Sequence, residues 1–303
     1  MNYIDEIPFF SGGKELRIIE DGWSDDIKIV AEDVHSNKFV CRLSDIAQLF
    51  IKQKEFHYVQ KLNKLTDMVP KVYEVGTLTD HNLCYIIYEY VEGVEAGPII
   101  NHYSEEEQVE FGRKAGKLLK IIHSIPVRDK FDIYFKIKNK LEKKKIAYKI
   151  ANIREEKHDL IVSYLDAHLE LLKNRPTVFC HGDFHLGNML INEAKELKII
   201  DFNRCDLEDP YQDFNRMLCF GRRYSIPFTN GQINGYFDGE VPPEEFFNII
   251  SFYASIDIGF GYLWAMKFGE DEIKVHNELK NQLLNDFEDY RITIPRWYQK
   301  EKV

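Results

Sequence analysis

The feature that most constrains this chain is an eight-residue polar loop that follows a short apolar run. The loop, residues 181–188, reads His-Gly-Asp-Phe-His-Leu-Gly-Asn, and the apolar run before it is 177–180. An apolar run bounded by turn residues indicates a buried strand. Gly182 and Gly187 let the loop bend where a Cβ atom would clash. The pattern therefore predicts a buried strand that ends in a tight loop carrying Asp183.

A β-hairpin is expected directly after this loop. Residues 189–191 and 197–200 are apolar enough to form two strands, and the polar segment 192–196 joins them as a turn. Such a hairpin would return Asp201 to the level of Asn188. Amide and carboxylate oxygens are ligands that a hard cation such as Mg²⁺ accepts. We therefore expect Asn188 and Asp201 to hold Mg²⁺ together.

The joint pattern also has the order of a known catalytic site. Asp183 can accept a proton from a hydroxyl group, and its spacing to Asn188 is the Asp-x-x-x-x-Asn of kinase catalytic loops. The chain resembles the aminoglycoside phosphotransferase and choline kinase family, whose fold is similar to that of protein kinases. The matching residues are His181-Gly182-Asp183-x-His185-x-x-Asn188, Ile200-Asp201-Phe202 and Asp209-Pro210-x-x-Asp213.

The sequence departs from the family pattern at two positions. Glu208 stands where many members have glycine before Asp-Pro, and Asn203 stands where protein kinases have glycine after Asp-Phe. Neither change removes an expected metal ligand, although Glu208 adds a negative charge. For Asp183 and Asp201, the alternative is that both are ordinary turn or capping residues.

The resemblance covers most of the chain and implies an α+β, bilobal, protein-kinase-like fold. Residues 1–92 would form a small nucleotide-binding lobe with a β-sheet and one helix, and 93–303 a mainly helical catalytic and substrate-binding lobe. It implies transfer of the γ-phosphoryl group of ATP or GTP to a hydroxyl, with Asp183 receiving the proton. His181 and Asp213 would support the loop through hydrogen bonds.

The first strands read as 16–19 and 27–30, with a polar loop between them. In the resembled family a loop here covers the nucleotide, so the Ser24 hydroxyl and nearby N–H groups are expected at a phosphate. Asp25 and Asp26 would repel phosphate if they pointed inward. An ordinary hairpin turn is the alternative.

A kinase-type site needs a cation on the third strand and an acid on the helix that follows. Arg42, on an expected strand at 38–43, is the candidate cation, and Lys28 on the preceding strand competes with it. Many kinases use lysine, but arginine can also contact phosphate in a bidentate way. A solvated strand charge is the alternative for either residue.

The helix that follows is expected at 44–65, begun by Ser44 or Asp45 as its cap. Glu55 is the expected acid partner of Arg42, unless it is an exposed glutamate beside Lys52. The helix should bury an apolar face formed by Ile46, Leu49, Phe50, Phe56, Val59 and Leu62.

Two more strands are expected at 70–76 and 84–91, and the second should lead into the hinge between lobes. There the resemblance implies that the adenine bonds to the Glu89 carbonyl and the Val91 N–H. Tyr88 would lie at the back of the base pocket, where a large side chain could restrict adenine or favour guanine. The choice between ATP and GTP therefore stays open.

The remainder reads as mainly helical. Residues 104–123 begin with a capping-box pattern, and 131–174 form a long charged stretch whose lysines are expected on a solvated face. Later helices, at 244–268 and 271–290, would line the substrate pocket in the resembled family. Acids that could contact substrate amino groups are Glu208, Asp257, Glu270, Asp271 and Glu272.

Composition favours a cytoplasmic enzyme. The 303 residues are 44% hydrophobic, and they include no apolar run long enough to span a bilayer and no evident secretory signal. The five scattered cysteines are expected to be reduced and buried, Cys180 included. The net charge of −10 disfavours nucleic-acid and anionic-membrane partners and suits a cationic small substrate, although many soluble proteins are acidic.

Three functions remain from the sequence. The first is phosphorylation of an antibiotic, foremost an aminoglycoside and next a macrolide. The second is a metabolic kinase for choline, ethanolamine, a sugar or an amino-acid alcohol, which the fold does not separate from the first. The third is a catalytically silent kinase-like protein that only binds nucleotide.

Overall fold

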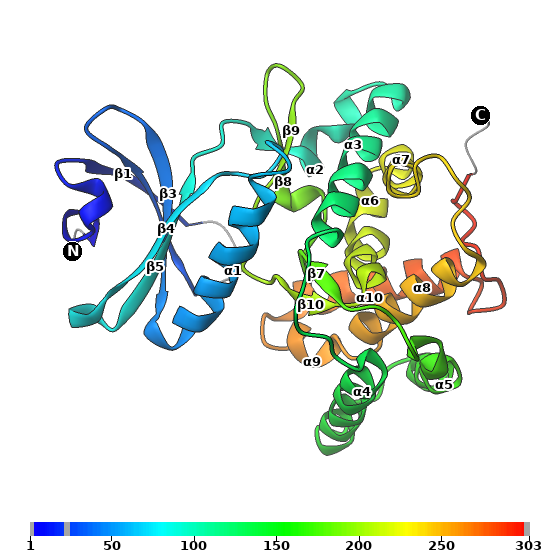
Figure 1. The fold of residues 1–303 in the computed structure, drawn as a ribbon. Coiled ribbons are helices and arrows are strands. Elements are labelled where there is room, and N and C mark those ends of the chain that lie inside the picture. The colour runs from blue at the N-terminus through cyan, green and yellow to red at the C-terminus, as the bar shows by residue number, and fades with distance from the viewer. Residues whose placement is uncertain (1–2, 21–24, 300–303) are drawn as a thin grey trace. The chain divides into compact units, whose positions relative to one another are not determined.

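A computed structural model describes residues 3–20 and 25–299 of the chain. The chain divides into two compact units (Figure 1). The first consists of Met1–Glu95 together with Asn188–Cys205, and the second of Ala96–Gly187 together with Asp206–Val303. A single boundary after residue 92, as the sequence suggested, does not describe this division, because the hairpin after the polar loop belongs to the first unit.

The first unit contains a five-stranded antiparallel sheet with the order β1-β2-β3-β5-β4. The expected strands are all present. Their bounds are β1 Lys14–Ile19, β2 Ile27–Glu32, β3 Lys38–Asp45, β4 Val72–Leu78 and β5 Leu83–Glu89.

The two faces of this sheet have different roles. Successive side chains of a strand point to opposite faces. On one face Cys41 of β3 lies in an apolar cluster with Ile4 and Phe10, which belong to the short 3₁₀ turns η1 (Tyr3–Glu6) and η2 (Pro8–Phe10). Arg42, the next residue of β3, therefore points to the opposite face.

A three-stranded sheet with the order β6-β8-β9 completes the first unit. Its strands are β6 (Val94–Glu95), β8 (Met189–Ile191) and β9 (Leu197–Ile199), so the predicted hairpin is confirmed. β6 pairs with β8, and the Ile199 N–H donates to the Met68 carbonyl at 2.9 Å. These bonds attach the hairpin to the N-terminal part of the chain.

The helix of the first unit is α1 (Leu49–Leu62), preceded by the 3₁₀ turn η3 (Ile46–Gln48). Asp45 caps η3 by accepting from the Ala47 N–H at 2.8 Å. The expected apolar face is wrong in part, because Phe50 is 78% exposed whereas Lys52 and Glu55 are buried. These two charges can be buried because each has a partner of opposite charge or a hydrogen-bond donor, as described below.

The second unit is mainly helical, with one two-stranded sheet formed by β7 and β10. The bounds of the strands are Val178–Cys180 and Asp206–Glu208. The helices are α2 (Ala96–Ile99), α3 (Glu105–His123), α4 (Ile133–Ile150), α5 (His158–His168), α6 (Arg222–Tyr224), α7 (Ile226–Tyr236), α8 (Glu244–Gly259), α9 (Tyr262–Ala265) and α10 (Glu270–Asp286). Short turns are η4 (Thr79–His81) in the first unit and η5 (Ile100–His102), η6 (Leu169–Leu172), η7 (Leu186–Asn188), η8 (Pro210–Phe214) and the π-helical η9 (Met217–Gly221) along the rest of the chain.

Helices α3 and α7 are in close backbone contact (Figure 1). The predicted capping box at the start of α3 is confirmed, with Ser104 and Glu107 bonding to each other's backbone N–H groups. A Cβ atom at Gly112 would lie 2.1 Å from the Phe228 carbonyl oxygen, and one at Gly231 would lie 2.2 Å from the Val109 carbonyl oxygen. Only glycine permits this approach.

Helix α8 forms the core of the second unit. By length and composition alone, the helical stretch Glu244–Ala265 could cross a membrane, but 72% of its apolar 18-residue segment is buried inside the protein. This is the property of a core helix. The five cysteines are buried, as expected, and burial raises the pKa of the Cys180 thiol well above its ordinary value.

Candidate active site

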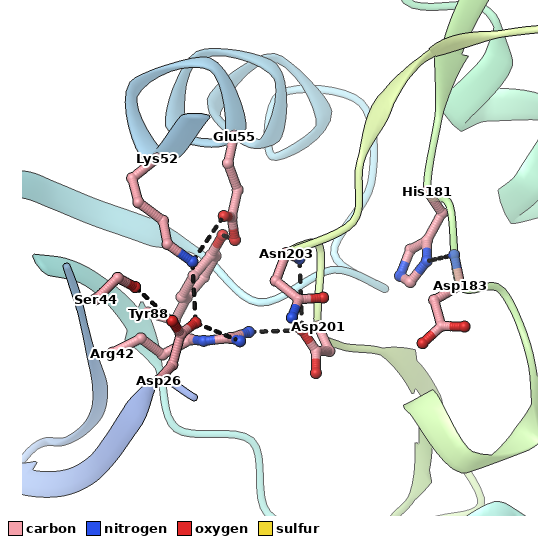
Figure 2. Close-up of polar contacts among 10 residues, drawn as sticks. All are labelled: Asp26, Arg42, Ser44, Lys52, Glu55, Tyr88, His181, Asp183, Asp201 and Asn203. Carbon is pink, nitrogen blue, oxygen red and sulfur yellow. Dashed lines mark hydrogen bonds and ion pairs between the residues drawn. The ribbon is translucent and has the colours of Figure 1, made fainter. Parts of the chain in front are cut away.

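A cluster of opposite charges lies on one face of the sheet of the first unit (Figure 2). Asp26, just before β2, accepts contacts from both cations of the cluster: Arg42 Nη2 is 2.9 Å and Lys52 Nζ 3.1 Å from its Oδ2. Ser44 donates its hydroxyl to Asp26 Oδ1 at 2.6 Å. One carboxylate thus pairs with two buried cations of the kind that hold phosphate.

Glu55 has different partners from those expected. Tyr88 donates its hydroxyl to Glu55 Oε1 at 2.5 Å, and Lys52 Nζ lies 3.6 Å from Oε2 (Figure 2). The ion pairs of Arg42 are instead with Asp26 and Asp201. Among the described residues, Lys52 and not Arg42 is thus the cation that lies next to the Glu55 carboxylate, one helical turn away along α1. The exposed alternative is wrong, since Glu55 is 0% exposed.

The ionisation of these groups follows from their neighbours. Burial alone would raise the pKa of the Asp26 carboxyl, but the Ser44 hydrogen bond and the charges of Arg42 and Lys52 lower it below the ordinary 3.8. Burial opposes the charge of Arg42, yet Asp201 and Glu55 raise the pKa of its guanidinium. Asp26 and Arg42 are therefore expected to be charged at neutral pH.

Asn188 and Asp201 lie at the open end of the β8–β9 hairpin, as the sequence predicted. The Ile200 N–H donates to the Asn188 carbonyl at 2.8 Å, which brings the residue before Asp201 opposite Asn188. Asp201 has a left-handed backbone (φ 66°), a conformation that costs energy in most residues and is frequent at functional sites. Its Oδ1 lies 2.5 Å from Arg42 Nη1.

The donors at this end of the hairpin fit a hard divalent cation. A carboxylate on Asp201 and an amide oxygen on Asn188 are oxygen ligands of the kind that such an ion prefers. Arg42 would have to share Asp201 with the ion. The chemistry of the donor set therefore agrees with the expected Mg²⁺.

The structure gives the positions of only some of the other residues that were predicted to contact the nucleotide. Lys28 on β2 pairs with Arg42 across the strands, so both lie on the same face of the sheet. Glu89 ends β5 and Val91 follows it, beyond the strand. Ser24 lies outside the described residues. Their roles toward a nucleotide stay predictions.

In the second unit, Asp213 holds the backbone of the polar loop. Its carboxylate accepts from the N–H groups of His181 at 2.8 Å and Gly182 at 2.7 Å, and its Oδ2 lies 3.1 Å from His123 Nε2. Burial would raise the pKa of Asp213, but His123, His181 and the Gly182 N–H lower it below 3.8. Gly182 has a φ of 82°, which explains the glycine at this point of the loop.

His181 supports the loop from within. Its Nδ1 accepts from the Asp183 N–H at 3.2 Å, which closes a short turn (Figure 2). His181 is 0% exposed, so the ring is a fixed part of the loop. The geometry agrees with a supporting role for His181 and Asp213.

The Asp183 carboxylate faces a cation that the sequence reading did not select. Arg216 Nε lies 3.1 Å from Asp183 Oδ1, and His185 Nε2 lies 3.6 Å from the same oxygen. Arg216 Nη1 is also 3.7 Å from Asp257 Oδ2. Asp257, proposed from sequence as a substrate contact, thus has an internal cation as its neighbour.

The other candidate substrate acids differ in their surroundings. Glu208 on β10 pairs with Lys136 of α4 at 2.7 Å, and burial raises the pKa of the Glu208 carboxyl. Glu270 and Asp271 are exposed in the first turn of α10, where acids also suit the helix dipole. The extra charge of Glu208 is therefore matched by Lys136.

Three residues of these clusters were missed by sequence reasoning: Asp26, Lys52 and Arg216. A weak signal existed for Lys52, because it lies three residues before Glu55 and seven before Val59 and so shares their helix face. Arg216 lies three residues after Asp213 within the matched motif region. Nothing in the local sequence identifies Asp26 as the partner of two cations distant in sequence.

Comparison with known proteins agrees with the fold and the motif. A sequence model of the phosphotransferase enzyme family matches residues 15–246. No curated protein matches this sequence closely enough to count as a relative.

Solved structures with this fold include several antibiotic kinases. One is an APH(2") aminoglycoside phosphotransferase in complex with GDP and kanamycin (17% identity, TM-score 0.69, covering 94% of this chain and 98% of that one). Another is an amicoumacin kinase in complex with AMP-PNP, Ca²⁺ and Ami (13%, 0.66, 93% and 90%). A third is spectinomycin phosphotransferase APH(9)-Ia in complex with ADP and spectinomycin (14%, 0.63, 88% and 92%). The fold is therefore the protein-kinase-like fold, and the chain belongs to the phosphotransferase enzyme family.

Proposed function

We propose that this protein transfers the γ-phosphoryl group of ATP or GTP to a hydroxyl of a small molecule, with an aminoglycoside-type antibiotic as the first candidate acceptor. The observation that carries the proposal is the ordered set Asp183, Asn188 and Asp201, with the loop backbone held by Asp213 and the hairpin in the expected register. Family membership supports phosphotransfer in general.

In this proposal the acceptor oxygen attacks the γ-phosphorus, the bond to the β–γ bridging oxygen breaks and the nucleoside diphosphate leaves. Asp183 orients the hydroxyl and receives its proton. Phosphoryl transfer depends mainly on positioning and charge neutralisation. When bound, Mg²⁺ would neutralise phosphate charge, and Asn188 and Asp201 would hold it.

Arg42 and Lys52 are the proposed phosphate cations of the first unit. Both are buried, and both contact Asp26. A triphosphate can replace this carboxylate because it offers the same kind of anionic oxygen with more charge. Glu55 and Tyr88 would keep Lys52 and the helix in place, while the Glu89 carbonyl and the Val91 N–H are the proposed contacts of the base.

An amine-bearing acceptor would have to recruit acids that now have other neighbours. Asp257 lies beside Arg216 and Glu208 pairs with Lys136. Glu270 and Asp271 are exposed and need no exchange of partners. The cationic character of the acceptor therefore rests mainly on the net charge of −10 and on these two exposed acids.

A catalytically silent nucleotide-binding protein is the second candidate. The specific observation in its favour is that Asp26 already pairs with both Arg42 and Lys52. The intact set of Asp183, Asn188 and Asp201 favours an active enzyme instead.

Acceptor-stimulated release of nucleoside diphosphate tests the proposal. We would assay ATP and GTP in parallel with aminoglycosides, macrolides, choline, ethanolamine and simple sugars. Stimulation by an antibiotic class that is lost in Asp183→Asn supports the first candidate, and stimulation by choline, ethanolamine or a sugar assigns a metabolic kinase. Tight Mg²⁺-nucleotide binding without stimulation by the panel or by metabolite extracts supports the silent protein and contradicts the proposed transfer.

A further inference from the structure

In the second unit a single guanidinium lies between two carboxylates. Arg216 Nε is 3.1 Å from Asp183 Oδ1, and Arg216 Nη1 is 3.7 Å from Asp257 Oδ2. Asn215 donates its side-chain N–H to Asp257 Oδ2 at 2.8 Å and so holds the second carboxylate. The side chains of Arg216 and Asp183 are only 20% and 17% exposed, so their interaction is screened less than that of a surface pair.

The contact between Arg216 and Asp183 is electrostatic more than a hydrogen bond. Arg216 Nε is buried and makes no hydrogen bond among the described residues, although Asp183 Oδ1 is close enough for one. The N–H is therefore poorly aligned with that oxygen. The place of the guanidinium depends on its other neighbour, Asp257, as well as on Asp183.

The backbone around Arg216 has an unusual form. Arg216 directly precedes the π-helical turn η9 (Met217–Gly221). Such turns are rare in proteins overall, but those that occur are often at functional sites. The same segment carries Asp213, which holds the loop backbone, and Asn215, which holds Asp257. Residues 213–216 thus restrain both the backbone of the polar loop and the carboxylate of Asp183.

We propose that Arg216 is a positioning residue for Asp183 and that Asp257 limits how strongly Arg216 holds that carboxylate. The inference rests on the proposed function, in which Asp183 receives the hydroxyl proton. A carboxylate paired with one arginine alone is a weaker base. Because Asp257 shares the positive charge of the Arg216 guanidinium, Asp183 is oriented by Arg216 and can still accept a proton.

Other charged groups also face this cluster. His185 Nε2 lies 3.6 Å from Asp183, and its Nδ1 accepts from the Gly187 N–H at 3.0 Å, so in a neutral ring the proton is on the nitrogen that faces Asp183. Lys144 of α4 interacts electrostatically with Asp257, and Asp213 with Arg216. These groups are the same in every variant below.

The test compares Arg216→Gln with Asp257→Asn in the full chain. The titration midpoint of the Asp183 carboxyl carbon is followed by carbon-13 NMR, with its signal assigned by Asp183→Asn. We expect Arg216→Gln to move the midpoint to higher pH, because a positive neighbour is lost. Asp257→Asn should move it to lower pH, because a negative neighbour is lost and Arg216 is no longer shared.

Turnover gives a second readout once an acceptor is known. Arg216→Gln should lower kcat about 10- to 100-fold with unchanged nucleotide binding, since misplacement of a catalytic group is costly. The acidic limb of the kcat profile should move with the NMR midpoint, and Arg216→Lys should recover part of the loss. If Arg216 had only a structural role, replacing it would lower the amount of folded enzyme without moving the acidic limb of the kcat profile.

Arg223→Gln is the matched control. Arg223 is a nearby arginine in sequence, 38% exposed and paired with Glu278 at 3.2 Å, so its loss removes the same charge outside the cluster. The control should leave the Asp183 midpoint unchanged. Midpoints that do not move, or that move in the same direction in Arg216→Gln and Asp257→Asn, would overturn the inference. The NMR readout needs no turnover, so failure of the proposed function and failure of this inference are distinguishable.

Discussion

The charge cluster of the first unit and that of the second have opposite arrangements. In the first, the carboxylate of Asp26 lies between two cations, Arg42 and Lys52. In the second, the guanidinium of Arg216 lies between two carboxylates, Asp183 and Asp257. Each arrangement avoids a buried charge without a partner, which would destabilise the fold.

The difference between the clusters matches the chemistry proposed for each. Arg42 and Lys52, which are proposed to bind phosphate, can be held in place by the Asp26 carboxylate until an incoming phosphate replaces it. A carboxylate that must receive a proton needs a fixed orientation without too strong a cation beside it. The first cluster is thus suited to exchange the Asp26 carboxylate for phosphate. The second is suited to hold the Asp183 carboxylate in a fixed orientation.

The largest effect should come from removing the proton acceptor of the second cluster. Asp183→Asn should lower acceptor-stimulated turnover by about 10²- to 10⁴-fold, because general-base catalysis contributes in that range. Nucleotide binding, measured by calorimetry, should change little. Turnover close to the original rate would remove Asp183 from its assigned role.

A smaller but clear effect is expected from Asp201→Ala in the first unit. The dissociation constant for Mg²⁺-nucleotide should rise at least about tenfold, or about 1.4 kcal/mol. Binding of nucleotide in the presence of EDTA should be affected much less, since Asp201 is assigned to the metal. Equal losses with and without Mg²⁺ would mean that Asp201 acts only through Arg42.

Asp26→Asn tests whether the first cluster exchanges its anion. Freed from the competing carboxylate, Arg42 and Lys52 should bind nucleotide a few-fold more tightly, a change of about 1 kcal/mol or less. The matched control is Asp33→Asn, because Asp33 lies in the exposed turn after β2 and its carboxylate accepts from the N–H groups of two nearby residues, His35 and Asn37. Weaker nucleotide binding in Asp26→Asn alone would show that Asp26 supports the cations and does not compete for them.

The smallest effect concerns acid stability. The folded-state pKa of Asp26 is lowered below 3.8, so its contribution to stability is complete above that pH and is lost as the pH falls through the lowered value. Asp26→Asn should therefore flatten the fall in melting temperature between about pH 4 and pH 2. A slope as steep as that of the unchanged protein would contradict the assigned pKa direction.

Much of the fold could be predicted from sequence because its signals are local. The loop at 181–188 and the β8–β9 hairpin follow from short apolar runs and turn residues, and the capping box of α3 follows from Ser104 and Glu107. The family motif then selects Asp183 as the candidate proton acceptor without knowledge of the fold.

The charge partners could not be predicted in the same way. The Arg42 contact with Asp201 joins residues far apart in sequence, and the buried face of α1 contains Lys52 and Glu55 where apolar residues were expected. Periodicity identifies a face by its apolar residues. It therefore fails where buried charges neutralise one another.

The most direct test of the account is to look for the phosphorylated acceptor itself. The unchanged protein and Asp183→Asn would be incubated with Mg²⁺, ATP or GTP, and the acceptor that stimulates nucleoside diphosphate release, and the acceptor would then be analysed by mass spectrometry. The account predicts a phosphate ester on an acceptor hydroxyl with the unchanged protein and almost none with Asp183→Asn. A phosphate ester formed equally by both proteins, or diphosphate release without any ester, would contradict it.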